Sequence, residues 1–431
     1  MVYRLSSLDP DFEKGFQTLL GLKREVSEDV DRAVHAIIAD VRARGDAALA
    51  EYSLKFDRAD LGKLGIAINA AEIRAARARC SAADLAALEL AASRIRAYHE
   101  RQKPADMRFT DALGVELGWR WSPISAVGLY VPGGSASYPS SVLMNAIPAK
   151  VAGVSRLVMV VPTPDGVISP LVLAAAQIGG VDEIYRVGGA QAVAALAYGT
   201  ETIRPVFKIV GPGNAYVAAA KRQVFGQVGI DMIAGPSEVV VIADKTARAD
   251  FIAADLLAQA EHDEAAQSIL ITDDPALGEA VATELERQLA SLQRQKIAAA
   301  SWRDNGAIVL VKDMAEAATL SNRLAPEHLE IMSAEPDAVA ATISDAGAIF
   351  LGEHTPEAVG DYVGGSNHVL PTARSARFAS GLGVYDFVKR TSLLRCGPEQ
   401  LRAIGPAAVT LGEAEGLQAH ARSVSIRLGD A

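Results

Sequence analysis

Four segments of the chain combine imidazole rings with amide or carboxylate side chains at close spacing. The first, Gln259-Ala260-Glu261-His262, ends a helix that we expect over residues 249–262. Because residues three apart share one helix face, Gln259 and His262 point the same way. An oxygen and a nitrogen donor at this spacing suit a divalent metal such as zinc. A histidine at a helix end also commonly contacts the last carbonyl groups, so this segment alone leaves a structural role open.

A second pair, Glu327 and His328, is adjacent in the sequence and follows Pro326. Since proline must end or begin an element, we expect this pair in a turn between a helix over residues 314–324 and a short strand over residues 330–332. An acid beside an imidazole can divide proton transfer near neutral pH, with one group activating water and the other shuttling a proton. A charged surface turn is the alternative interpretation.

Two further segments hold an acid and a histidine. Asp361 and His368 belong to a glycine-rich stretch over residues 360–368, which we expect to be a loop that is either structural or ligand-binding. Glu415 and His420 lie five positions apart, too far to share one helix face, so we expect a bend at Gly416. A solvated polar tail would explain this last segment equally well.

Glycines at strand ends hint at a nucleotide. Gly211-Pro212-Gly213-Asn214 follows an expected strand and opens an expected helix, which suits a phosphate at a helix N-terminus. Similar segments occur at residues 130–134 and 188–191. The sequence contains neither the full GxGxxG fingerprint nor a P-loop, so these glycines alone do not establish a dinucleotide.

The elements that must position these groups alternate between strand and helix. Short apolar runs separated by helical segments predict βαβ units and a mainly parallel sheet. Two such blocks follow one another, one over residues 124–225 and one from residue 239 to residue 351. We expect helices before the first block, over residues 29–41 and 72–99, and a small helical appendage from residue 398 onward.

Composition narrows the classes of protein. The chain has 431 residues, half of them hydrophobic, which indicates a globular protein of two or three domains. Its net charge of -10 argues against a nucleic-acid partner. Cys80 and Cys396 form neither a disulfide framework nor a CxxC site, so we interpret them as packing residues. Without a signal-like N-terminus or an apolar run of about 20 residues, we expect a cytoplasmic protein without a membrane partner.

Eight segments, taken in order, resemble the histidinol dehydrogenase family, although each is unspecific alone. The resemblance runs from about residue 25 to the C-terminus. The segments cover residues 128–134, 188–191, 211–214, 230–238, 259–262, 322–330, 367–372 and 415–420.

The resemblance implies an α/β fold of two incomplete Rossmann-like domains with parallel sheets, plus small helical N- and C-terminal extensions. Its implied boundaries are an extension over 1–24, a first domain over 25–128 and 236–381, a second over 129–235, and a C-terminal domain over 382–431. It also implies an intertwined homodimer in which Glu415 and His420 act across subunits.

The activity implied by the resemblance is the final step of histidine biosynthesis, in which two NAD oxidise L-histidinol through L-histidinaldehyde to L-histidine. Glu327 and His328 would be the acid–base pair. Gln259, His262, Asp361 and His420 would hold one zinc per subunit and also contact the substrate. Ser237, His328, His368 and Glu415 would complete the substrate pocket, and Tyr130, Gln191 and Asn214 would contact NAD.

Two alternatives remain at this stage. A related zinc- and NAD-dependent enzyme could act on another small polyol or amino alcohol. The second alternative is a zinc hydrolase or a metal-binding protein without redox activity, because the dinucleotide fingerprint is missing. The presence of Ser237 with Glu415 and His420 favours the imidazole substrate.

Overall fold

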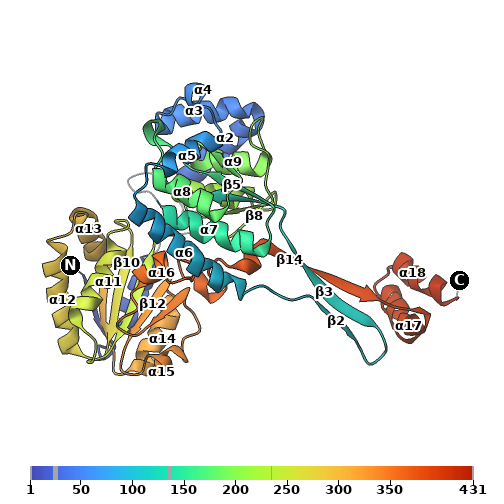
Figure 1. Ribbon diagram of the computed structural model, residues 1–431. Coiled ribbons are helices and arrows are strands. Elements are labelled where there is room, and N and C mark those ends of the chain that lie inside the picture. Colours follow the sequence, from blue (N-terminus) through green and yellow to red (C-terminus); the bar gives the residue numbers. More distant parts are fainter. Residues whose placement is uncertain (1, 23–27, 134–137, 234, 430–431) are drawn as a thin grey trace.

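The computed structural model describes residues 2–22, 28–133, 138–233 and 235–429. Within these ranges the strands form two parallel sheets, one of six strands and one of five, and a three-stranded antiparallel sheet. Figure 1 shows the two parallel sheets in separate lobes, and an arm that extends away from them and carries the C-terminal helices. The predicted α/β fold with two parallel sheets is therefore confirmed.

The five-stranded sheet has the order β6-β5-β4-β7-β8. Its strands are nearly all apolar because helices cover both faces, as a parallel sheet requires. Buried residues on its two faces form two separate hydrophobic clusters. The strands are β4 (Ala126–Tyr130), β5 (Arg156–Val160), β6 (Glu183–Tyr185), β7 (Lys208–Val210) and β8 (Gly229–Ile230), and the connecting helices are α7 (Pro139–Ala152), α8 (Pro170–Gly179), α9 (Gly189–Tyr198) and α10 (Ala215–Val224), with a 3₁₀ turn at Pro164–Gly166.

Helices from the N-terminal quarter pack on this same sheet. Val34 and Ile37 of α2 and Leu49 of α3 share a core with α9 and α10, while Leu88 and Ile95 of α6 share the opposite core. The family resemblance grouped residues 25–128 with 236–381, whereas this packing groups residues 28–100 with the five-stranded sheet. The domain boundaries themselves stay a prediction. These helices are α2 (Glu28–Arg44), α3 (Asp46–Asp57), α4 (Leu61–Leu64), α5 (Ala70–Arg77) and α6 (Ala82–Glu100).

One long helix predicted over residues 72–99 is two helices, α5 and α6. Ser81 ends the first run, because its hydroxyl accepts a hydrogen bond from the backbone N–H of Asp84 and so caps α6. The cap competes with continued helix through the Ala- and Arg-rich stretch, which helix propensity alone does not reveal.

The six-stranded sheet has the order β1-β11-β10-β9-β12-β13, with clusters on both faces. Its edge strand β1 pairs in parallel with β11, Tyr3 opposite Ala307, so the N-terminal extension is part of this sheet rather than helical throughout. The strands are β1 (Tyr3–Ser6), β9 (Glu238–Ala243), β10 (Gln267–Thr272), β11 (Ala307–Leu310), β12 (His328–Met332) and β13 (Ala348–Leu351), and the helices are α1 (Phe12–Gly21), α11 (Ala249–Ala260), α12 (Pro275–Leu289), α13 (Gln295–Asn305), α14 (Met314–Leu324), α15 (Pro336–Ala340) and α16 (Glu357–Tyr362).

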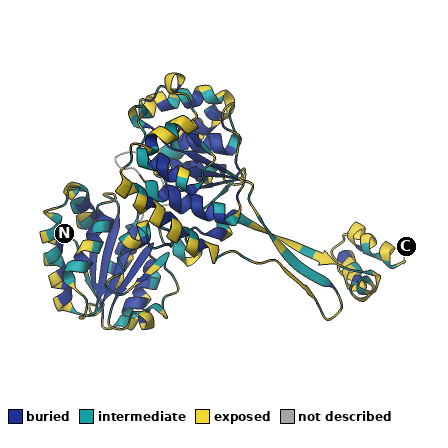
Figure 2. Cartoon of the chain, in the orientation of Figure 1, coloured by how far each residue is buried: buried dark blue, intermediate teal, exposed yellow. Residues whose placement is uncertain are grey.

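The arm consists of three antiparallel strands and a helical tip. β14 pairs along β3, from Val388 opposite Pro123 to Arg395 opposite Glu116, and β2 pairs on the other side of β3. Figure 2 shows that the arm is mostly exposed or half-buried, in contrast to the dark cores of the lobes. Its elements are β2 (Met107–Thr110), β3 (Glu116–Pro123), β14 (Val388–Arg395), α17 (Pro398–Ala414) and α18 (Gln418–Leu428), preceded by 3₁₀ turns at Ser375–Arg377 and Val384–Phe387.

Candidate active site

Glu327 and His328 lie at the point where the chain enters β12. Ala325 ends α14 in the left-handed conformation, with φ of 47°, and Pro326 then prevents further helix. Both side chains are buried, Glu327 at 6% exposure and His328 at 3%. The expected turn is present, but it leads into the interior, so the pair is not a charged surface turn.

Neighbouring strands hold this pair in place. The backbone N–H of Glu238, at the start of β9, donates to Oε2 of Glu327 at 2.9 Å. The backbone carbonyl of Glu238 accepts from Nδ1 of His328 at 3.1 Å. Because a carbonyl oxygen can only accept, Nδ1 carries the ring proton and Nε2 of a neutral His328 has a free lone pair. The geometry thus sets the tautomer that a base acting through Nε2 needs.

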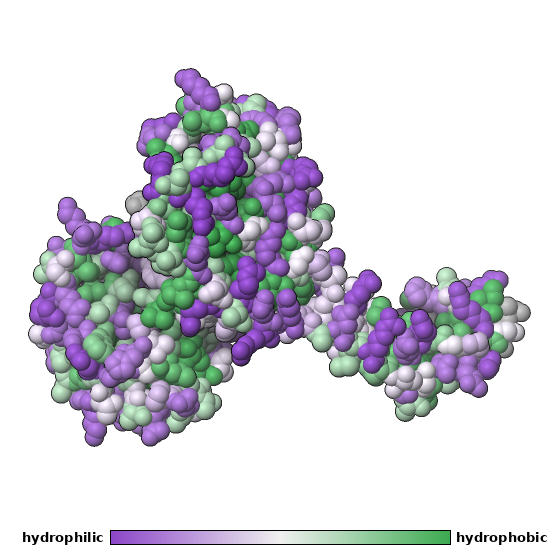
Figure 3. Space-filling model, in the orientation of Figure 1, coloured by the Kyte–Doolittle hydropathy of each residue, from purple (hydrophilic) through white to green (hydrophobic). Residues whose placement is uncertain are grey.

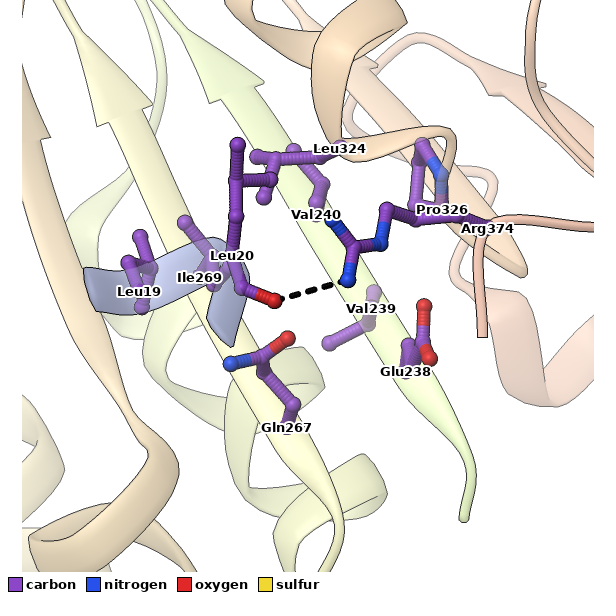
Figure 4. A pocket seen from close by; sticks show the side chains of 10 residues that line it. All are labelled: Leu19, Leu20, Glu238, Val239, Val240, Gln267, Ile269, Leu324, Pro326 and Arg374. Carbon is purple, nitrogen blue, oxygen red and sulfur yellow. Dashed lines mark hydrogen bonds between the residues drawn. The ribbon is translucent and has the colours of Figure 1, made fainter. Parts of the chain in front are cut away.

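Glu238 is itself fixed by a turn on the far side of β9. Its Oε1 accepts from the backbone N–H of Ala373 at 2.9 Å. Figure 4 shows Glu238 beside Arg374, whose guanidinium donates to the carbonyl oxygen of Leu20 at 2.8 Å. The surrounding gap between α1, β9 and β10 has a volume of about 10 Å³. This room suits at most one water molecule, so we interpret the region as packing that supports the pair.

Of the predicted metal ligands, Asp361 lies on the side of His328 that carries Nε2, and Gln259 and His262 contact each other. Nε2 of His328 is 3.6 Å from Oδ1 of Asp361, which lies on α16 rather than in the expected loop. Nε2 of Gln259 is 3.3 Å from Nδ1 of His262, as the helix spacing predicted. His262 and Asp361 are close enough to influence each other's pKa.

His368 and Ser237 border the same site. Nδ1 of His368 donates to the backbone carbonyl of Asp361 at 3.0 Å, and its Nε2 is 3.1 Å from the hydroxyl of Ser141, which donates to it. Burial lowers the pKa of His368, which favours this neutral form. Ser237 is half-buried and directly precedes Glu238. Glu415 and His420, by contrast, are exposed on the helical tip of the arm, with the expected bend at Gly416, where φ is 72°.

Electrostatics make the site unusual. Burial alone would lower the pKa of His328, but the carboxylates of Glu357, Glu327 and Asp361 outweigh it and raise that pKa to about 10. Burial raises the pKa of Glu357 to about 8. Burial is the main reason that the pKa of His262 is lowered. Several carboxylates gathered around one imidazole make an environment that a divalent cation would stabilise.

The donor set fits a zinc ion in part. Oε1 of Gln259 is completely buried and has no hydrogen-bond partner among the described residues, which is costly unless something else binds it. Gln259, His262 and Asp361 supply two oxygens and one nitrogen. Within the described ranges no three His, Cys, Asp or Glu side chains form a metal cluster, and the fourth predicted ligand, His420, lies on the arm.

A cavity of about 490 Å³ joins the two lobes beside this site. One wall comes from the five-stranded lobe and includes Tyr130 and Asn214, and the other comes from the six-stranded lobe and includes His262. In the orientation of Figure 3, apolar surface is visible where the lobes meet. The cavity therefore brings two of the three residues predicted to contact NAD to one of the predicted metal ligands.

The nucleotide candidates gather at the carboxyl edge of the five-stranded sheet, as ligands of open parallel sheets usually do. Tyr130 ends β4, and its hydroxyl accepts from the backbone N–H of Gly189 at 2.9 Å. Gln191 is buried in the first turn of α9. Asn214 caps α10, its side chain accepting from the backbone N–H groups of Tyr216 and Val217.

The Gly211 turn is fixed by a buried ion pair. The side chain of Asp231 accepts a hydrogen bond from the backbone N–H of Gly211 at 2.7 Å. Lys221 donates to the backbone carbonyl of Gly211 at 3.0 Å and forms an ion pair with Asp231. Gly211 has φ of 112°, and a Cβ there would lie 2.1 Å from the carbonyl oxygen of Tyr130. Only glycine therefore permits this close approach of β4 to the turn.

Several residues of the site were assigned no role from the sequence. Glu238 and Glu357 are buried against His328, but neither belongs to a motif of paired histidine and acid. The ion pair between Lys221 and Asp231 was not predicted either, because a buried ion pair between distant positions leaves no periodic pattern in the sequence. A charged residue at the first position of a β-branched run, as at Glu238, was the one available hint.

Comparison with known proteins identifies the family of this chain. The family model described as histidinol dehydrogenase matches residues 22–428. The chain belongs to the histidinol dehydrogenase family. The predicted class, an NAD-dependent oxidoreductase of this type, is thereby confirmed.

Relatives and solved structures match over nearly the whole length. The histidinol dehydrogenase of Rhizobium meliloti is 67% identical over 428 residues, with 99% of both chains covered. That of Nitrobacter winogradskyi is 69% identical, with 99% of this chain and 100% of the relative covered. The crystal structure of histidinol dehydrogenase from Elizabethkingia anophelis has a TM-score of 0.94 at 37% identity, covering 99% of this chain and 98% of the other.

None of the helices in the described part of the chain combines the length and apolarity needed to cross a bilayer.

Proposed function

We propose that this protein oxidises L-histidinol through L-histidinaldehyde to L-histidine with two NAD, the final step of histidine biosynthesis. The observation that carries this proposal is the cavity between the lobes. It places Tyr130 and Asn214 opposite His262. Asp361, a neighbour of His262, lies 3.6 Å from His328. A cofactor on one wall and a substrate on the other would meet at the acid–base pair.

Gln259, His262 and Asp361 would hold the zinc, together with His420. When bound, the zinc would orient the substrate's amine and imidazole groups and favour their neutral forms. The same residues, with Ser237, His368 and Glu415, would line the substrate pocket. Support comes from the buried, unpartnered Oε1 of Gln259 and from the surplus of negative charge around His328.

The chain's own residues would move the protons. In the first oxidation Nε2 of His328 takes the hydroxyl proton while the carbinol C–H hydride passes to NAD. The aldehyde then adds water, from which Glu327 takes a proton, and His328 repeats its role in the second hydride transfer. The Glu238 carbonyl holds the proton of Nδ1, so His328 can gain and lose its second proton only at Nε2, which supports this assignment.

His420 and Glu415 would reach the site of a second subunit. In Figure 1 the arm carries both away from the site of their own chain. The tip buries little: Gly405 and Gly412 of α17 and Ala421 of α18 are its buried helical residues in the described range. So small a core does not stabilise a domain alone, and a homodimer in which the arm lies on the partner would supply the missing contacts.

The test is production of NADH from L-histidinol, followed by absorbance at the nicotinamide band. We expect two NADH per histidinol, loss of activity after chelation, and recovery with zinc. No NADH from L-histidinol, but NADH from another amino alcohol, would instead support the related dehydrogenase of different substrate. A metal-dependent hydrolase without redox activity would reduce no NAD with any alcohol.

A further inference from the structure

Arg294 borders the cavity between the lobes and has no role in the site described so far. It directly precedes α13, where its backbone carbonyl accepts from the N–H groups of Ile297 and Ala298. These bonds hold its backbone at the start of the helix, and α13 packs against α11 and β10. The guanidinium is therefore attached to a fixed part of the six-stranded lobe.

The charges on this wall of the cavity are otherwise negative. Asp263 and Glu264 line it, and Arg294 is the only lysine or arginine among the described residues that border the cavity. The whole chain is acidic as well, with a net charge of -10. Because carboxylates in a partly enclosed space repel an anion, an anionic ligand of this cavity needs a cation beside it, and Arg294 can supply that charge.

The guanidinium of Arg294 keeps most of its donors available. Its Nη2 donates to the backbone carbonyl of His262 at 3.3 Å. Within the described part of the chain it makes no second hydrogen bond and no ion pair, although two carboxylates line the same cavity. A guanidinium has five N–H donors in a planar fork that matches two phosphate oxygens. The contact with His262 uses one donor and leaves the others for a ligand.

The opposite wall holds Tyr130 and Asn214, two of the residues predicted to contact NAD. L-Histidinol has an amine and an imidazole but no anionic group, so its recognition does not use a guanidinium. In NAD the anionic group is the pyrophosphate, because the nicotinamide ring is positively charged and adenine is neutral. The pyrophosphate is therefore the part of these two ligands that matches Arg294 in charge and geometry.

Resting on the proposed function, we propose that Arg294 binds the pyrophosphate of NAD from the six-stranded lobe, opposite Tyr130 and Asn214 on the five-stranded lobe. The cofactor then joins the two walls of the cavity. Since the pyrophosphate takes no part in hydride transfer, the contact is the same before the reaction and during it. It contributes to the affinity for NAD and leaves the chemical step unchanged.

The kinetic experiment compares the full-length variants Arg294→Gln and Arg294→Lys with Arg303→Gln, a control on α13 whose side chain is 60% exposed. Because Gln removes the charge, we expect KM for NAD to rise about 10- to 100-fold. KM for histidinol, and kcat at saturating NAD, should change less than about threefold. Arg294→Lys keeps the charge without the fork, so it recovers part of the affinity, and Arg303→Gln behaves as wild type.

Binding of cofactor fragments, measured by calorimetry without turnover, locates the contact. ADP-ribose contains the pyrophosphate and adenosine does not. We expect Arg294→Gln to weaken ADP-ribose about 10- to 100-fold and to leave adenosine within about twofold of wild type. Equal losses for both fragments would contradict a contact with the pyrophosphate. So would a loss limited to the product L-histidine, whose carboxylate is the competing anion.

A KM for NAD within about twofold of wild type in Arg294→Gln would overturn the proposal. An equal loss in KM for histidinol would also overturn it, because the guanidinium would then only support the end of α11 at His262. If Arg294→Gln does not fold, the wild-type chain decides. ADP-ribose should bind more tightly than adenosine, by a margin that shrinks as salt is added, and equal affinities contradict the contact.

Failure of the proposed function gives a different result. A wild-type protein that produces no NADH from histidinol, but binds ADP-ribose in a way that depends on Arg294, would refute the proposed function and support this contact. Two NADH per histidinol, with ADP-ribose binding unaffected in Arg294→Gln, would support the function and refute the contact.

Discussion

His328 is a strongly perturbed residue of the site, and its ring lies among three carboxylates from two segments. Glu327 precedes β12, and Glu357 and Asp361 lie on α16. Each of these acids would be costly in an apolar interior by itself, but around one imidazole they stabilise positive charge. We therefore expect the activity of the protein to depend on His328 more than on any other histidine of the chain.

Replacing His328 by Asn removes the ring whose Nε2 lies 3.6 Å from Oδ1 of Asp361. We expect kcat for both oxidations, of histidinol and of histidinaldehyde, to fall about 10²- to 10⁴-fold, the usual contribution of a general base. Steady-state assays with each substrate check this. His354→Asn is the control, because that imidazole is 82% exposed. Retention of aldehyde oxidation alone would limit the base role to the first step.

The proposed function gives Glu327 the narrower role of activating water. In Glu327→Gln we expect the first oxidation to remain within about tenfold of wild type, while the second slows by about 10²-fold or more. The product ratio should then fall from two NADH per histidinol towards one, with aldehyde trapped by an amine reagent. An unchanged ratio, with both steps equally slow, would assign Glu327 to the first proton transfer as well.

At the scale of elements, the two sheets approach the cavity by opposite edges. Tyr130 and the Gly211 turn follow strands of the five-stranded sheet, whereas Glu327, His328 and Glu238 lie where strands of the six-stranded sheet begin. Ligands of parallel sheets usually bind at the carboxyl ends of strands. Here only the five-stranded lobe follows that rule, and the catalytic pair is presented by the amino ends of β9 and β12.

A charged network ties β5 and β6 of the five-stranded sheet together. Hydrogen bonds from Arg156, Arg204 and Tyr185 lower the pKa of Glu183 from its usual 4.5 to about 2, although partial burial opposes them. Because the folded-state pKa is lowered, the stabilisation is present above about pH 4.5 and is lost as the pH falls towards 2.

Glu183→Gln should therefore lower the free energy of unfolding by about 1–3 kcal/mol at pH 7, and by less at pH 4. Urea unfolding followed by circular dichroism at the two pH values measures the difference. The control is Glu284→Gln, since Glu284 pairs with Arg287 on the surface of α12. A difference that is equal at both pH values would mean that the network does not depend on the charge of Glu183.

At the scale of the whole molecule, the arm is the feature that supports the proposed second subunit. It exposes large apolar side chains on strands and helices alike, at Met107, Phe109, Leu394, Leu411, Leu417 and Ile426. Exposed apolar groups along an extended arm are typical of a surface that another chain covers. The proposed second subunit would also bring the predicted ligand His420 to the predicted metal site.

Subunit complementation tests this arrangement. His262→Asn and His420→Asn homodimers should each be nearly inactive, since each lacks one zinc ligand at both sites. After the two are unfolded and refolded together, half of the dimers are mixed and each mixed dimer has one intact site, so about a quarter of wild-type activity should return. Refolding each variant alone is the control. No recovery in the mixture would place His420 in the site of its own chain.

The sequence by itself determined most of the local elements and predicted the reactive groups. Apolar runs bounded by glycine and proline predicted the strands from β4 to β13 except β8, because burial on both faces requires them. The helix spacing of Gln259 and His262, and the bend at Gly416, also followed from local geometry. Ordered motifs were needed to connect these fragments to one family, since each fragment alone had a structural alternative.

Only the tertiary structure decided which groups meet. The approach of His328 to Glu238 and Glu357 joins positions far apart in the chain, and the parallel pairing of β12 with β9 sets it. The position of helices α2 to α6 on the five-stranded sheet, and the strand pairing that forms the arm, are likewise long-range. Such contacts depend on which apolar faces and strand edges find each other, and residue order along one segment carries no record of that choice.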